Sequence, residues 1–444
     1  MFSKILYILL ALVILMVLIT VHEFGHYIAG KIFKFKINEF SIGFGKAIYK
    51  KTRKDGEVFS IRILPLGGYC AFEGEDEENP GKDAFNSKPA WQRLIVLFSG
   101  VLFNFIFGIL TSAIYLMVAG YGVPVISAAN DSIIAQNLRV GDKIVAVNNK
   151  TIEAYRPAAD LMAKYANENT ITLTIERNGE VFDVEIEKLN QENGYYYVAN
   201  AQNIIENLYV ATSFDGENNP LTYQAYNIDD FRQYVINSLV TKTIEEDKTI
   251  YTPEFDQKFY QLVDVTDPTT GDTTKVYQEY TVEKMIKDKV IIHGGLGKSL
   301  GINYYQVAQK YGFFESLLKA WPFAFYICGV ILKSLGGLFT GATKIKDLTG
   351  TIGTISTIAN VSAMNPLNIL FLFPMLSLNL AVFNFLPIPA LDGARSLFVL
   401  WEAITKKPVN RKVEGIIHTV GLIVLLALVV FLDVYNMIIV PLTT

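Results

Sequence analysis

The chain has 444 residues, of which 51% are hydrophobic and 18% are charged, so apolar and water-exposed segments must alternate along it. The formal net charge of -4 offers no basic field for a nucleic acid, and nucleic-acid binding is therefore disfavoured. The two cysteines, Cys70 and Cys328, lie in different contexts and predict neither a disulfide framework nor a cysteine-based zinc site.

The first apolar segment covers residues 5–21 and contains one polar side chain, Thr20. Its helical pattern continues to Gly30, which provides about the 20 residues that a bilayer requires. We therefore predict a first transmembrane helix over residues 1–30. A signal peptide is the alternative, but no small-residue cleavage site follows the apolar stretch.

An H-E-x-x-H motif, formed by His22, Glu23 and His26, lies near the end of this helix. A spacing of four residues places both imidazoles on one helix face, where they can bind one Zn²⁺. Glu23 lies beside the metal and can take a proton from water and later deliver it to the leaving amine. Ionisable groups in a membrane helix are costly and persist where they function, although a helix end that reaches the interface is the alternative. The motif predicts an intramembrane zinc metalloprotease.

Three further apolar segments are predicted to span the membrane: residues 94–120, 367–393 and 416–440. Prolines interrupt the second of these segments. The stretch 31–93 and the loop 394–415 are rich in lysine and arginine, and the positive-inside rule places both in the cytoplasm. Both termini and residues 121–306 then lie outside the cytoplasm, and the predicted metal site lies toward the cytoplasmic face.

Residues 321–340 test this topology because they are almost apolar enough to cross the membrane. A span at this position would reverse the direction of the next one and place the five cations of residues 394–415 outside the cytoplasm. We therefore predict interfacial or re-entrant helices over residues 307–366.

A third protein ligand is needed, because two histidines leave a tetrahedral zinc ion incomplete. The segment NFLPIPALDG, which begins at Asn384, ends with Asp392 and Gly393 at the predicted membrane depth of the histidines. Pro387 and Pro389 unwind the helix, so the chain near Asp392 can bend toward the metal. The unwound backbone and the Asn384 side chain could hold an extended substrate by β-type pairing. An ordinary proline-interrupted helix end with a solvated aspartate is the alternative.

Residues 121–306 show the alternating apolar pattern of a β-rich domain. Gly141-Asp142 precedes one predicted strand, and a hairpin turns at Asn178-Gly179. With predicted helices at 131–137 and 156–166, the segment resembles a PDZ domain, whose groove accepts a peptide as an added strand. An unrelated small β-rich domain is the alternative.

Residues 190–296 are polar and rich in tyrosine, with acidic clusters and turn signals. They are predicted to form an insertion that precedes a closing strand at 301–306. The sequence indicates no role for this insertion, and its single histidine, His293, is predicted to be a surface residue rather than a metal ligand. His418, in the fourth predicted span, is expected near the cytoplasmic interface.

HEFGH in the first span and N-x-x-P-x-P-x-L-D-G in the third together resemble the site-2 protease family, and within it the bacterial RseP/RasP-type enzymes of regulated intramembrane proteolysis. Residues 40–70 are similar to the membrane-associated β-hairpin of that family, and residues 84–108 to the start of its second span. Two positions depart from the family pattern: Ala394 replaces a usual glycine, and Thr349-Gly350-Thr351 stands where S-G-P is common.

The resemblance implies Zn²⁺ as the cofactor, with ligands His22, His26 and Asp392, Glu23 as the catalytic acid and base, and substrate positioning by Asn384 with Pro387 and Pro389. It implies a polytopic α-helical membrane protein of about four spans, with a membrane-associated β-hairpin and an extracytoplasmic β-rich PDZ-like domain, in the bacterial cytoplasmic membrane.

The partners implied by the resemblance are the lipid bilayer and single-span membrane substrates such as anti-sigma factors or signal-peptide remnants. A non-proteolytic membrane scaffold, with a structural metal site and a peptide-binding PDZ domain, is the alternative function. A metal transporter is disfavoured, because one ligand cluster at one depth provides no path across the bilayer.

Overall fold

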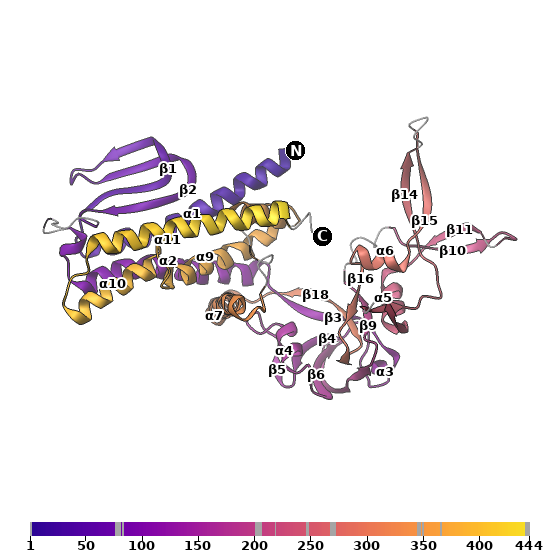
Figure 1. Ribbon diagram of the computed structural model, residues 1–444. Helices are drawn as coiled ribbons and strands as arrows, with labels where there is room; N and C mark the ends of the chain where they lie inside the picture. The colour runs from indigo at the N-terminus through magenta and orange to yellow at the C-terminus, as the bar shows by residue number, and fades with distance from the viewer. Residues whose placement is uncertain are drawn as a thin grey trace. The chain divides into compact units, whose positions relative to one another are not determined.

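The computed structural model of the protein describes residues 2–75, 81, 84–199, 207–217, 219–245, 248–266, 272–343, 348, 350–364 and 366–439. The chain forms two compact units (Figure 1): Met1–Gly120 with Lys310–Thr444 is the helical unit, and Tyr121–Gln309 is the β-rich unit. Clusters of buried apolar side chains lie within each unit, so each has a hydrophobic core of its own. Thr349, one of the residues at which the sequence departs from the family pattern, lies outside the described residues.

The helical unit contains helices α1 (Phe2–Ile32), α2 (Ala90–Val118), α7 (Phe313–Thr340), α8 (Thr351–Met364), α9 (Ile369–Phe385), α10 (Asp392–Thr405) and α11 (Arg411–Val434), and a short 3-10 helix, η1 (Phe85–Ser87). Four described segments are long and apolar enough to cross a membrane: Leu6–Ile32, Ala90–Val118, Phe313–Thr340 and Arg411–Met437. These segments confirm an integral membrane protein, and they include the predicted first, second and fourth spans.

α7 and α9 differ in length from their predictions. α9 has 17 residues, because the chain turns extended at Leu386, whereas α7 is a continuous helix of 28 residues despite Pro322. In Figure 1, α1, α2, α9 and α11 run lengthwise across the view and α7 is seen nearly end-on, so α7 crosses the direction of the others. This arrangement favours α9 as a span and α7 as an interfacial helix, and their depth in a membrane stays a prediction.

The predicted membrane-associated hairpin forms, and both of its strands fold back on themselves. β1 (Ile37–Thr52) and β2 (Val58–Phe72) pair antiparallel in two registers, so that Phe40 pairs with both Phe59 and Cys70. The first half of β1 therefore lies between the two halves of β2, and residues 68–72 form an outer strand. Gly43, with φ of +86°, permits the bend in β1, because a side chain there would be strained.

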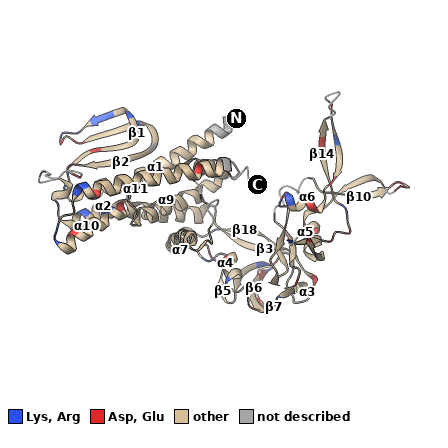
Figure 2. Cartoon of the chain, in the orientation of Figure 1, with Lys and Arg blue, Asp and Glu red and all other residues tan. Residues whose placement is uncertain are grey.

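Basic residues gather at one end of the helical unit. Figure 2 shows Lys and Arg on β1 and at the end of the helices where α10 lies. The N-terminal end of α1 and the C-terminal end of α11 lie at the opposite end of the unit (Figure 1). The positive-inside rule requires this distribution if the α10 end faces the cytoplasm, and that orientation stays a prediction.

The β-rich unit contains a sheet with the strand order β18-β3-β4-β6-β7, made of β3 (Tyr121–Ala129), β4 (Lys143–Val147), β6 (Thr170–Arg177), β7 (Glu180–Glu187) and β18 (Ile302–Gln309), with β5 (Lys150–Thr151) paired to β4. The predicted turn at Asn178-Gly179 joins β6 to β7, and the predicted closing strand is β18, which pairs along β3. α3 (Asp131–Ile134) and α4 (Ala158–Lys164) lie within the two predicted helical ranges. These strands and helices agree with the predicted β-rich domain. Its resemblance to a PDZ domain and its binding of a peptide as an added strand stay predictions.

The insertion has a second core, in which Phe231 of α5 (Ile228–Asn237), Met285 of α6 (Val282–Lys287) and Ile291 of β16 (Ile291–Gly294) are fully buried. Gln233 joins α5 to strand β3, because its side-chain amide pairs with both the N–H and the carbonyl of Ala129. The remaining strands of the unit are β8 (Leu189–Gln191), β9 (Tyr195–Val198), β10 (Tyr209–Phe214), β11 (Pro220–Ala225), β12 (Val240–Glu245), β13 (Lys248–Pro253), β14 (Tyr260–Thr266), β15 (Thr273–Glu279) and β17 (Gly297–Ser299).

Candidate metal centre

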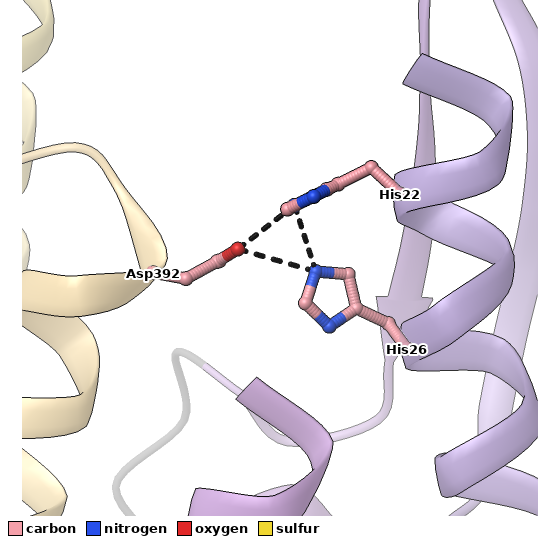
Figure 3. A group of neighbouring side chains, drawn as sticks. All are labelled: His22, His26 and Asp392. Carbon is pink, nitrogen blue, oxygen red and sulfur yellow. Dashed lines mark hydrogen bonds and ion pairs between the residues drawn. The ribbon is translucent and has the colours of Figure 1, made fainter. Parts of the chain in front are cut away.

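Three side chains from distant parts of the chain converge in the helical unit (Figure 3). His22 and His26 lie on α1, and Asp392 is the first residue of α10. His22 Nε2 lies 2.8 Å from Asp392 Oδ2 and 3.1 Å from His26 Nε2, and His26 Nε2 lies 3.3 Å from the same oxygen. The structure thus brings together the three residues that the sequence predicts as ligands.

The spacing of these atoms fits a tetrahedral zinc ion. Bonds of about 2.0–2.1 Å in tetrahedral geometry place the ligand atoms roughly 3.3 Å apart. The observed separations of 2.8, 3.1 and 3.3 Å are close to that value. Two imidazoles and one carboxylate are also the donor set of many catalytic zinc sites, in which a fourth position stays open for water.

Two glycines let α2 approach the face of α1 that carries His22 and His26. A Cβ at Gly25, inside HEFGH, would lie 2.4 Å from the Ser99 carbonyl oxygen, so a larger residue would force the helices apart. A Cβ at Gly100 would lie 2.5 Å from His26 Nε2 and 2.7 Å from His22 Cε1. Gly100 therefore leaves the space that the two imidazoles occupy.

Hydrogen bonds to α2 orient both imidazoles. His26 Nδ1 donates to the Val96 carbonyl over 2.8 Å, so its Nε2 carries the lone pair that a metal needs. The Asn104 side-chain amide lies 3.3 Å from His22 Nδ1, and Asn104 is fully buried. Asn104 Oδ1 has no hydrogen-bond partner among the described residues. A 180° rotation of the Asn104 side-chain amide places Oδ1 where it accepts a hydrogen bond from His22 Nδ1–H. With its proton on Nδ1, His22 then has a lone pair on Nε2 that can bind a metal.

Glu23 lies where two cavities meet. The first, of about 210 Å³, is lined by His22, Asn384 and Asp392, and the second, of about 310 Å³, by His26, Asp392 and residues 69–72 of β2; Glu23 lines both. Glu23 Oε2 accepts a hydrogen bond from the Cys70 N–H over 3.0 Å, which turns the carboxylate toward the outer strand of the sheet.

Cys70 lines the second cavity as well, so its sulfur must be considered as a metal ligand. Burial raises the pKa of the Cys70 thiol well above its ordinary range. A protonated thiol is a poor ligand, because metals bind the thiolate. The chemistry therefore leaves the two histidines and Asp392 as the donor set.

The segment between α9 and α10 brings Asp392 to α1. Ala390 has a positive φ of 80°, and its N–H donates to Nδ1 of His418 on α11 over 3.0 Å. Asn384 lines a cavity, whereas Pro387 and Pro389 are absent from the described residues that line either one. The two prolines shape the loop, and their predicted contact with substrate stays a prediction.

Gly100, Asn104 and His418 are among the residues that support the site and were not predicted from the sequence. A signal for Asn104 was present, because an amide inside an apolar span is costly unless it has a partner. His418 was expected at the interface without a role, and its bond to Ala390 depends on how α11 packs. The need for Gly100 follows only from the packing of α2 on α1.

Comparison with known proteins extends the resemblance over most of the chain. The sequence profile of peptidase family M50 matches residues 10–428. The protein named Regulator of sigma E protease of Haemophilus influenzae is 27% identical, over 94% of this chain and 95% of its own length. Proteins named "Putative zinc metalloprotease" from Fusobacterium nucleatum and Thermotoga maritima are 27% and 26% identical, each over 96% of this chain and over 97% and 98% of their own lengths.

Proposed function

Because the chain belongs to peptidase family M50, the site-2 protease family, we propose that it is an intramembrane zinc metalloprotease that hydrolyses peptide bonds of single-span membrane proteins. The observation that carries the proposal is the convergence of His22, His26 and Asp392 beside Glu23, in helices long and apolar enough for a membrane. Family membership alone predicts a zinc metalloprotease, and the geometry supports an intact site in this chain.

In this proposal His22, His26 and Asp392 hold Zn²⁺. A bound zinc ion would polarise the scissile carbonyl and acidify a water molecule. Glu23 accepts a proton from the attacking water and delivers it to the leaving amine, a role that its position between the two cavities supports. Its hydrogen bond from the Cys70 N–H holds the carboxylate in place between the two transfers.

The substrate would bind as an extended strand. The Cys70 N–H points away from β1 toward Glu23, so the free edge of residues 68–72 faces the site. A substrate segment added to this edge would pass beside Glu23. Asn384 would hold the same segment from the opposite cavity, while Pro387 and Pro389 keep the chain before Asp392 from continuing as a helix.

The proposed substrates are single-span proteins of the bacterial cytoplasmic membrane, of the anti-sigma factor or remnant signal-peptide class. One relative is named Regulator of sigma E protease, which supports the first class. The proposed orientation places the metal site toward the cytoplasm and the PDZ-like domain outside it, as the distribution of basic residues supports. In that position the domain would exclude substrates that keep bulky outer domains.

The test uses detergent-purified full-length protein and single-span test substrates. Glu23→Gln keeps an oxygen for the Cys70 N–H but cannot carry the proton, so we expect full zinc content and at least about a 100-fold loss of cleavage. Asp392→Asn should lose zinc as well as cleavage. Glu185→Gln, an exposed position on β7, is the matched control and should leave both unchanged.

Unaltered cleavage by the Glu23→Gln variant would contradict the mechanism. A wild-type protein that binds zinc and cleaves no single-span substrate would favour the scaffold function instead.

A further inference from the structure

Helix α10 carries an exposed apolar stripe. Leu397, Trp401 and Ile404 are 52%, 61% and 72% exposed, and their spacing of four and three residues places them on one helix face. At 1.5 Å per residue, the 14 residues of α10 span about 21 Å, which is shorter than the roughly 30 Å hydrocarbon core. The helix can therefore lie on a membrane but cannot cross one.

The opposite face of α10 is anchored inside the protein. Glu402 is buried and forms ion pairs with Arg93 of α2 over 2.6 Å and with Arg411 of α11 over 2.7 Å. Ser396 and Val399 are buried on the same face. These contacts fix the rotation of α10 about its axis, so the apolar stripe must point outward.

The acidic side chains of α10 point into the protein, whereas the two lysines that follow the helix are exposed. Its two acidic residues, Asp392 and Glu402, are directed at the histidines and at Arg93. Lys406 and Lys407, which follow the helix directly, are exposed. The exposed residues of α10 and the two residues that follow it therefore include apolar side chains, a tryptophan and two cations, and no carboxylate of the helix is among them. This is the composition of a helix that lies in the interface of an anionic leaflet.

We propose that α10 binds anionic phospholipid at the membrane surface, and that this contact holds Asp392 in place. The stripe enters the acyl boundary while Lys406 and Lys407 contact the phosphates. Because Asp392 is the first residue of α10 and lies 2.8 Å from His22 Nε2, a shift of the helix would move a proposed metal ligand. This coupling rests on the proposed metal site, whereas the lipid contact does not.

The lipid contact is tested with Trp401 as the reporter. Trp91→Phe and Trp321→Phe leave Trp401 as the only tryptophan of the full chain. In nanodiscs, phosphatidylglycerol brominated near the head of its acyl chains should quench this tryptophan more strongly than brominated phosphatidylcholine at the same mole fraction. Since each lysine near an anionic surface contributes roughly fivefold to binding, Lys406→Gln and Lys407→Gln together should remove the preference. Lys242→Gln on the β-rich unit is the matched control.

Binding of anionic phospholipid would be overturned by equal quenching by the two brominated lipids, or by quenching by aqueous acrylamide alone. Shielding of Trp401 together with a doubled molecular mass would assign the stripe to a second copy of the chain and would overturn it too.

The coupling is tested by the rate at which a soluble chelator removes zinc. Wild-type protein should lose zinc several-fold more slowly in equimolar phosphatidylglycerol and phosphatidylcholine than in phosphatidylcholine alone. The variant with both Lys406→Gln and Lys407→Gln should lose zinc at the same rate in the two lipid compositions. Equal rates for the wild type would overturn the coupling and leave the Trp401 result standing. A chain without zinc in either lipid would overturn the proposed metal site and the coupling with it.

Discussion

The Cα of Gly100 on α2 faces the imidazole of His26 on α1 so closely that a Cβ at Gly100 would lie 2.5 Å from His26 Nε2. The same Cβ would approach His22 Cε1 at 2.7 Å. Gly100→Ala should therefore displace both imidazoles and weaken zinc binding by about 10- to 100-fold, a range typical of changes next to the ligands. Competition with a chromophoric chelator measures the affinity.

Gly329→Ala on α7 is the matched control for this substitution, because a Cβ at Gly329 meets no described atom within 4 Å. It should bind zinc as tightly as the wild type. Wild-type zinc affinity in Gly100→Ala would show that the two imidazoles do not need this space.

Asn104 provides a test of how His22 is oriented. If the amide oxygen accepts from His22 Nδ1–H, Asn104→Asp should retain zinc, because the carboxylate accepts the same bond. Asn104→Leu removes the acceptor and should weaken zinc binding by about 10- to 100-fold. Zinc titration of the two variants shows whether the Asn104 side chain accepts a hydrogen bond from His22 Nδ1 or donates one to it. A larger loss in the aspartate variant than in the leucine variant would mean that the amide donates to His22 instead.

His418 is expected to stabilise the loop that carries Asp392. His418→Leu leaves the Ala390 N–H without its acceptor, which should cost about 1–3 kcal/mol and lower the thermal midpoint in detergent. His418→Asn keeps an acceptor near the position of Nδ1 and should recover part of the loss. Equal midpoints for wild type and His418→Leu would remove His418 from the support of the metal site.

The β-rich unit is expected to be dispensable for zinc binding. Tyr121 pairs with Gln309 at the ends of β3 and β18, so a short linker can replace residues 122–306 without stretching the chain. The shortened protein should keep its zinc and cleave substrates whose bulky outer domains protect them from the full-length enzyme. Zinc analysis and cleavage of a matched pair of substrates, with and without an outer domain, measure the two effects. Loss of zinc on deletion would contradict the independence of the two units.

The secondary structure beside the site could largely be predicted, because its signals are local. The spacing within HEFGH was enough to place His22 and His26 on one face of α1, since helix geometry depends only on nearby residues. The apolar lengths of α1, α2 and α11 likewise predicted spans. The length of α9 was predicted less well: the predicted span continued to residue 393, whereas the helix ends at Phe385, because Pro387 cannot donate the next helical hydrogen bond. For α7 the sequence predicted only helices somewhere within residues 307–366, and the helix covers Phe313–Thr340.

The sequence by itself determined which residues can ligate zinc and which helix presents two of them, because residue chemistry and helical periodicity are properties of a short segment. Only the tertiary structure decided that Asp392 reaches them, since that contact joins residues 370 positions apart through the packing of α1 and α10 on α2. It also decided that Gly100 makes room for the imidazoles, that Asn104 faces His22 and that the stripe on α10 points outward. Each of these depends on which helix faces pack together, and no local pattern specifies that.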